Sequence, residues 1–68
     1  MQVVAKVFSD KVIIKKYEKS DTVEEVIVRA PIIKIDFKRK TITACFPLLT
    51  SDRFMEHVFK VDTIEEYV

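Results

Sequence analysis

The stretch IIKIDFKRKTITACF, residues 32–46, decides the fold class, because apolar and polar side chains alternate along both of its arms. Alternation with a period of two is the pattern of a strand with one buried face. Folding the chain back about residues 39–40 places six apolar side chains on one face. They form three predicted pairs, Phe37 with Ile42, Ile35 with Ala44 and Ile33 with Phe46. Arg and Lys disfavour the positive φ angles of a two-residue type I′ turn, so we expect a four-residue loop from Lys38 to Thr41.

A second hairpin is predicted in VVAKVFSDKVIIKKY, residues 3–17, with its fold about Ser9 and Asp10. One face is then wholly apolar and consists of Val3, Ala5, Val7, Val12 and Ile14. The other face is also rich in apolar side chains, namely Val4, Phe8, Ile13 and Tyr17, although Lys6, Lys11 and Lys15 interrupt it. A hairpin that is apolar on both faces is expected at the centre of a sheet, in a closed barrel or at a dimer contact.

Two further segments have ambiguous patterns. Residues 23–30 read as a strand that ends before Pro31, and a short helix is the alternative, because Asp21 and Glu24 have the spacing of a helix capping box. Beyond Pro47, the helical spacing of Phe54, Val58 and Val61 predicts a short helix that starts near Ser51. A strand from Phe54 to Val61 is the alternative. The sequence DTVEE at 21–25 recurs as DTIEE at 62–66, and we draw no function from this repetition.

Composition places the chain in the mainly β class. Val, Ile and Thr supply 23 residues against seven of Leu, Ala and Met, and β-branched side chains favour strands. We expect a small antiparallel sheet or a partly open barrel built from hairpins, with a short C-terminal helix, or an α+β fold if that helix is long. Residues 1–68 form one small domain, which buries only about 60% of its unfolded surface. Because 49% of the residues are hydrophobic, we expect some apolar surface to meet another chain.

Location and source are only weakly indicated by the sequence. No unbroken apolar run exceeds three residues, so we expect neither a secretory signal nor a membrane partner. The single cysteine, Cys45, fits a reducing compartment, and a cytoplasmic location is the expectation. The chain has no Gly, Asn or Trp and is rich in Lys and Glu, a composition reported for hyperthermophile proteins. An AT-rich coding sequence also produces this composition.

The sequence offers little material for catalysis or for binding a cofactor. Cys45 or a serine, together with the lone His57, is the only pairing of a nucleophile with a base, and no glycine is present to shape a nucleophile turn or a phosphate loop. One Cys and one His are too few for a zinc site. We therefore expect no enzyme, no metal, no cofactor and no small-molecule substrate.

Two functional hypotheses follow. The first is a self-associating, non-enzymatic interaction or regulatory module that acts through protein contacts, most simply as a homodimer. Its predicted contact residues are large and apolar: Val4, Phe8, Ile13, Tyr17, Phe54 and Met55. Charge gives the second hypothesis, since residues 1–40 carry ten Lys and Arg against six Asp and Glu.

The alternative is thus a protein that binds nucleic acid, or another acidic partner, as a dimer through a basic hairpin. Its predicted contacts are Lys15, Lys16, Lys34, Lys38, Arg39 and Lys40, with Thr41 and Thr43 able to donate to phosphate oxygens. Asp36 interrupts this stripe, and the pattern provides no aromatic side chain on that face for base stacking. Lysines on an edge strand also prevent aggregation between sheets, so a purely protective role remains open.

Overall fold

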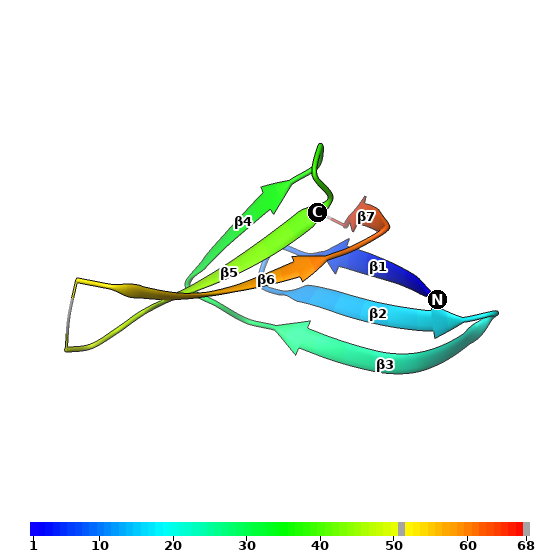
Figure 1. Ribbon diagram of the computed structural model, residues 1–68, viewed down its shortest axis with the longest axis horizontal. Coiled ribbons are helices and arrows are strands. Elements are labelled where there is room, and N and C mark those ends of the chain that lie inside the picture. Colours follow the sequence, from blue (N-terminus) through cyan, green and yellow to red (C-terminus); the bar gives the residue numbers. More distant parts are fainter. Residues whose placement is uncertain (51, 68) are drawn as a thin grey trace.

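The computed structural model describes residues 1–50 and 52–67, and within these residues it contains seven strands and no helix (Figure 1). The strands are β1 Gln2–Val7, β2 Val12–Glu18, β3 Asp21–Val28, β4 Ile32–Asp36, β5 Thr41–Pro47, β6 Phe54–Lys60 and β7 Thr63–Glu66. Sheet A has the order β3-β2-β1-β7, and sheet B has the order β4-β5-β6. The two sheets face each other without closing into a barrel. The mainly β class is confirmed, but sheet A is mixed, because β7 runs parallel to β1.

The N-terminal hairpin folds about Ser9 and Asp10 as predicted. Val7 lies opposite Val12, and the Phe8 N–H donates to the Lys11 carbonyl at 2.9 Å to close the loop. Both strands are central, since β1 lies between β2 and β7 while β2 lies between β3 and β1. A central place in a sheet therefore accounts for much of the two-sided apolar pattern.

The second hairpin has a different register from the predicted one. Ile35 lies opposite Ile42, a shift of two residues that keeps the predicted inner face but leaves Phe37 in the loop. The loop has four residues, 37–40, and so starts one residue earlier than predicted. Its position is fixed by Asp36, whose Oδ1 accepts the Arg39 N–H at 2.9 Å, and by Lys40, which takes a left-handed φ of 55°.

The predicted C-terminal helix is wrong, because residues 54–60 form strand β6. This strand pairs along its whole length with β5, from Pro47 opposite Phe54 to Thr41 opposite Lys60. Pairing with a neighbour satisfies the strand backbone, and tertiary packing of Phe59 against the core outweighs the helical spacing. Ser51, the predicted helix start, lies outside the described residues. The segment with the capping-box spacing was predicted as a strand with a short helix as the alternative, and strand β3 confirms the strand.

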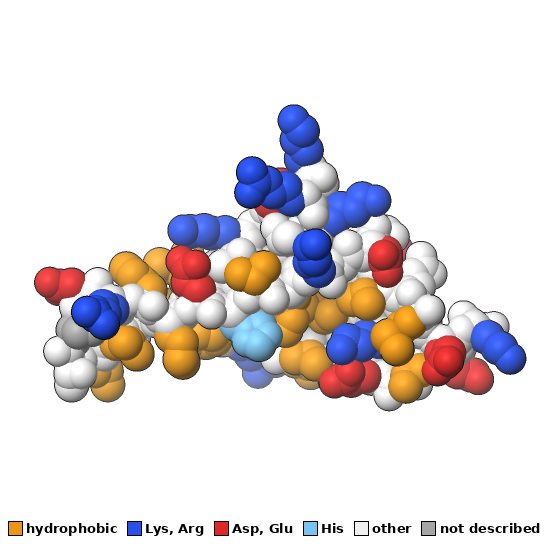
Figure 2. Space-filling model, in the orientation of Figure 1, with side chains coloured by type: hydrophobic (Ala, Val, Ile, Leu, Met, Phe, Trp, Pro, Cys, Tyr) orange, Lys and Arg blue, Asp and Glu red, His pale blue; other side chains and the backbone are white. Residues whose placement is uncertain are grey.

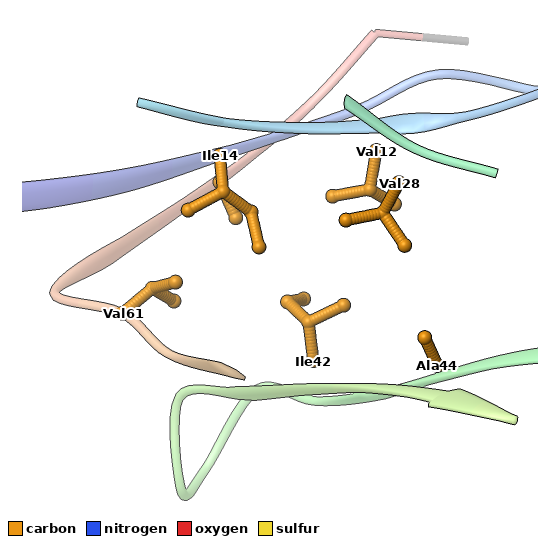
Figure 3. Close-up of a cluster of buried hydrophobic side chains, with 7 residues drawn as sticks. Val12, Ile14, Val28, Ile42, Ala44 and Val61 are labelled. Carbon is orange, nitrogen blue, oxygen red and sulfur yellow. The ribbon is translucent and has the colours of Figure 1, made fainter. Parts of the chain in front are cut away.

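The hydrophobic core lies between the two sheets. Val12, Ile14 and Val28 extend from sheet A toward Ile42 and Ala44 of sheet B (Figure 3). Ala5 and Val61 complete the buried cluster, and Ile42 and Val12 are among its largest fully buried side chains.

A two-residue connection, Val61 and Asp62, carries the chain from sheet B to sheet A. The Val61 N–H donates to the Lys40 carbonyl at 3.0 Å. Asp62 forms a reciprocal pair with Val3: its N–H donates to the Val3 carbonyl at 2.8 Å, and its Oδ2 accepts the Val3 N–H at 2.8 Å. The repeated DTVEE and DTIEE sequences thus lie at the starts of β3 and β7. Strand β3 pairs with β2, the strand before it in the chain, whereas β7 belongs to sheet A although β6 before it belongs to sheet B.

The two sheets are offset, and each extends past the other. The β2–β3 hairpin projects at one end of the molecule and the β5–β6 hairpin at the other (Figure 1), which gives an elongated shape of 44 × 22 × 21 Å. The far half of the β5–β6 hairpin therefore has no opposing sheet to cover it.

Candidate functional site

Exposed apolar side chains gather on the projecting β5–β6 hairpin and on the adjacent start of β4. Figure 2 shows them at the end of the molecule that this hairpin forms. We call this surface the apolar end, and it consists of Ile32, Leu48, Leu49, Phe54, Met55 and Val58. Phe54, Met55 and Val58, all from β6, are 55%, 59% and 56% exposed. So many large apolar side chains on one projection are typical of a surface that meets a partner.

Of the six residues predicted for self-association, only Phe54 and Met55 lie at the apolar end. Val4 is buried within the chain, and Ile13 and Tyr17 are half-buried in sheet A. The sequence interpretation missed Val58, which the expected helix placed on one face with Phe54 and Val61. A strand over this segment, which was the alternative, places Phe54 and Val58 on one face, because alternate residues of a strand point to the same side.

Phe8, the remaining predicted contact residue, packs against Tyr67 instead. The two rings stack at a centroid distance of 5.2 Å, and the Lys11 Nζ lies 5.5 Å from the centroid of the Phe8 ring. The Tyr67 hydroxyl donates to Glu65 Oε1 at 2.9 Å. This hydrogen bond, followed by partial desolvation and the negative charge of Glu65, raises the pKa of Tyr67 above its ordinary value. Phe8 therefore belongs to an aromatic contact within one chain.

The raised pKa of Tyr67 gives a prediction for alkaline pH. The folded protein holds the phenolic proton more tightly than the unfolded chain does, so the stabilisation is complete below the ordinary pKa and is lost as the pH rises through the raised pKa. We expect Glu65→Gln to lower the Tyr67 pKa in an ultraviolet titration of a Tyr17→Phe background. Glu66→Gln, on the other face of β7, is the control and should leave the Tyr67 pKa in place. An unchanged titration in the Glu65 variant would contradict this assignment.

A cationic cluster surrounds the β4–β5 turn, and Figure 2 shows Lys and Arg side chains gathered there at the top of the view. Four predicted contact residues, Lys34, Lys38, Arg39 and Lys40, lie in this turn or on β4. The sequence interpretation missed Lys60, which β6 places directly opposite Thr41. We call the five residues together the basic turn.

Asp36 lies within this cluster and is engaged with Arg39. One of its carboxylate oxygens accepts the Arg39 N–H in the loop, and the other lies 3.9 Å from Arg39 Nε.

Phe37, predicted to face inward, is instead 54% exposed. It lines an open depression of about 590 Å³ together with Lys34, Arg39 and Thr43. The expectation that this surface lacks an aromatic side chain is therefore wrong.

The other two predicted basic contacts, Lys15 and Lys16, lie in sheet A rather than at the basic turn. Lys16 Nζ is 3.0 Å from Glu24 Oε2 on the neighbouring strand β3. Lys15 is paired in register with Glu25, also on β3. The structure therefore divides the predicted basic set into a group at the turn, where Arg39 lies beside Asp36, and a group beside the carboxylates of β3.

Cys45 and His57 do not form a nucleophile–base pair. His57 is paired in register with Ala44, so its side chain lies on the face opposite to that of Cys45. Cys45 is buried, with its Sγ 3.9 Å from Glu56 Oε1, and the His57 ring packs against Phe59 at a centroid distance of 4.3 Å.

Among residues 1–50 and 52–67 there is no group of three or more His, Cys, Asp or Glu that could hold a metal ion. In the same residues no helix has the length and apolar character needed to cross a membrane.

The chain matches no protein-family model, no curated protein and no solved structure.

Proposed function

We propose that this chain is a non-enzymatic, self-associating β module that acts through protein contacts, with a homodimer as its working unit. The apolar end supports this proposal. Apart from Ile32 at the start of β4, its side chains lie on a hairpin that extends beyond the opposing sheet, so sheet A of the same chain leaves them exposed. Burial of a large apolar side chain contributes about 1.5–3 kcal/mol, which provides a driving force for association.

The test is light scattering coupled to size exclusion over a range of protein concentrations. We expect the wild-type chain to dimerise and the Phe54→Thr/Val58→Thr variant to dissociate at least about a hundredfold more easily, because two apolar side chains are lost from each copy. Threonine keeps the preference for strand, so β6 should persist. The control is Val23→Thr on β3, where the exposed side chain lies outside the apolar end. A wild-type chain that stays monomeric at high concentration would refute the proposal.

A second candidate function, binding of single-stranded nucleic acid, is supported by the exposed Phe37 within the basic turn. Proteins that bind single strands combine cationic side chains along the backbone path with aromatic rings on which bases stack. Phe37, Lys34 and Arg39 line one depression, and Thr41 and Thr43 add hydroxyl donors beside them. Nucleic acid would then bind at the turn end of sheet B, in a depression that Val58 of the apolar end also lines.

This candidate is tested with a short single-stranded oligonucleotide in a fluorescence binding assay at several salt concentrations. We expect affinity to fall steeply with salt, and the Lys38→Ala/Arg39→Ala/Lys40→Ala variant to reduce the slope of log K against log salt by about 2, at roughly 0.7 per lost phosphate contact. A matched triple of alanines at Lys11, Lys15 and Lys16 removes the same charge from β2 and the turn before it. If both triples weaken binding equally, the attraction comes from net charge and not from the basic turn.

A further inference from the structure

Strand β6 is one of the two edges of sheet B, and although it carries Lys60 it lacks the bulge, the short length and the preceding Pro that protect other edges. In the described part of the chain, β3 has an irregularity beside Val23, β7 has only four residues, and β4 follows Pro31 and carries Lys34. Bulges, short length, Pro and Lys all hinder pairing between edges. By contrast β6 has seven residues, a regular register with β5 and six exposed positions. It therefore presents a regular edge that can accept another strand.

The hydrogen bonds to β5 show which residues of β6 direct their backbone groups outward. The Leu48 N–H donates to the Arg53 carbonyl at 3.0 Å, and the Val61 N–H donates to the Lys40 carbonyl at 3.0 Å. In an antiparallel pair, alternate residues point their N–H and C=O groups at the same neighbour. The odd-numbered positions therefore bond to β5, and Phe54, Glu56, Val58 and Lys60 direct their backbone groups toward the open edge.

We propose that β6 pairs antiparallel with β6 of a second copy, with Val58 on the two-fold axis and Glu56 opposite Lys60 of the second copy. This inference deepens the proposed self-association and rests on it. Three hydrogen-bonded residue pairs would form about six backbone hydrogen bonds. On the outer face two Glu–Lys pairs then flank a central contact between the two Val58 side chains.

Charge selects this register from its neighbours. Only even-numbered residues can pair with one another, because only they direct their backbone groups outward. An axis through Glu56 would place two carboxylates together, which is destabilising. An axis through His57 would place Glu56 opposite Val58 and Lys60 opposite Phe54. The axis through Val58 is the one of these three registers that brings opposite charges together at both sites.

The inner face fits the same arrangement. His57 would lie opposite Phe59 of the second copy, which extends the His57–Phe59 ring contact already present in one chain. An apolar groove of about 290 Å³ lies between β3 and β6, lined by Val26, Val28 and Phe46 among others. Joining two β6 strands makes sheet B six strands wide and places sheet A of each copy on the same side, so the groove becomes interior.

Symmetric disulfide formation tests the register. In a Cys45→Ala background, Val58→Cys should form a disulfide-linked dimer under mild oxidation, because Cα atoms of a hydrogen-bonded pair lie about 5.5 Å apart and disulfides span roughly 4.4–6.8 Å. His57→Cys is the matched control and should remain unlinked. Efficient linking of the His57 variant but not of the Val58 variant would overturn the register. If both variants form dimers but neither forms the disulfide, the register is overturned and the proposed self-association stands. If the wild-type chain is monomeric, the register and the proposed self-association both fail.

Charge exchange gives an independent readout in solution. Glu56→Lys and Lys60→Glu should each weaken dimerisation roughly tenfold, because each change places like charges opposite one another at two sites. The double variant restores opposite charges in exchanged positions and should recover the wild-type dissociation constant. Glu24→Lys breaks an ion pair in sheet A and should leave dimerisation unchanged, and circular dichroism confirms that every variant is folded. A double variant as weak as either single variant would contradict the pairing.

Discussion

Replacing Ile42 with alanine is expected to lower the free energy of unfolding by about 2–5 kcal/mol. Ile42 is 0% exposed and lies at the centre of the core, where sheet B faces Val12 and Ile14 of sheet A. Truncation removes buried methyl groups and leaves a cavity that two sheets joined by short connections cannot easily close. A domain of this length has a total stability of roughly 3–10 kcal/mol, so a large fraction of the variant should be unfolded.

Chemical denaturation followed by circular dichroism measures this loss. The matched control is Ile27→Ala, which makes the same chemical change on edge strand β3 at a side chain that is 54% exposed. It should cost about 1 kcal/mol or less, in line with other exposed positions. Equal losses at the two positions would show that the core does not lie between the two sheets.

The second large effect is expected at Asp62, which connects the two sheets. Asp62→Ala removes the carboxylate that accepts the Val3 N–H and should cost about 1–2 kcal/mol, since the bond is charge-assisted but exposed. Asp62→Pro also removes the N–H that donates to the Val3 carbonyl and should cost about 3 kcal/mol or more. Amide exchange at Val3 and Tyr67 should accelerate in the same order. If the proline variant is no less stable than the alanine variant, the hydrogen bond from the Asp62 N–H to the Val3 carbonyl does not hold β7 in place.

The sequence predicted the fold class, and it predicted one of the two hairpins in its correct register. Val7 and Val12 could be paired because the SD turn lies symmetrically between two alternating arms. The register of the second hairpin differs from the predicted one by two residues, because the hydrogen bond that Asp36 accepts from the Arg39 N–H moves the loop. A shift of two residues keeps every side chain on the same face, so the alternation of apolar and polar residues cannot detect it. The helix prediction failed because Phe54 and Val58 satisfy a period of four as well as a period of two.

The candidate surfaces were predicted only in part, because both depend on pairings between distant segments. Phe37 is exposed only because of the shifted register, and Lys60 reaches the basic turn only through the pairing of β5 with β6. The offset between the two sheets exposes the apolar end, and no local pattern encodes that offset. Hydrophobic content correctly indicated excess apolar surface but not its place.

The pairing of β7 with β1 also has a consequence for synthesis of the chain. Val4 lies beside Thr63, far along the chain, so the outer strand β7 of sheet A can dock only after the intervening strands have been synthesised. While residues 63–66 are still inside the ribosome, β1 has an open edge where β7 will bind. A nascent chain stalled at that point is therefore expected to lack its complete sheet. Pulse proteolysis should find it more sensitive to protease than a chain stalled after residues 63–66 have emerged.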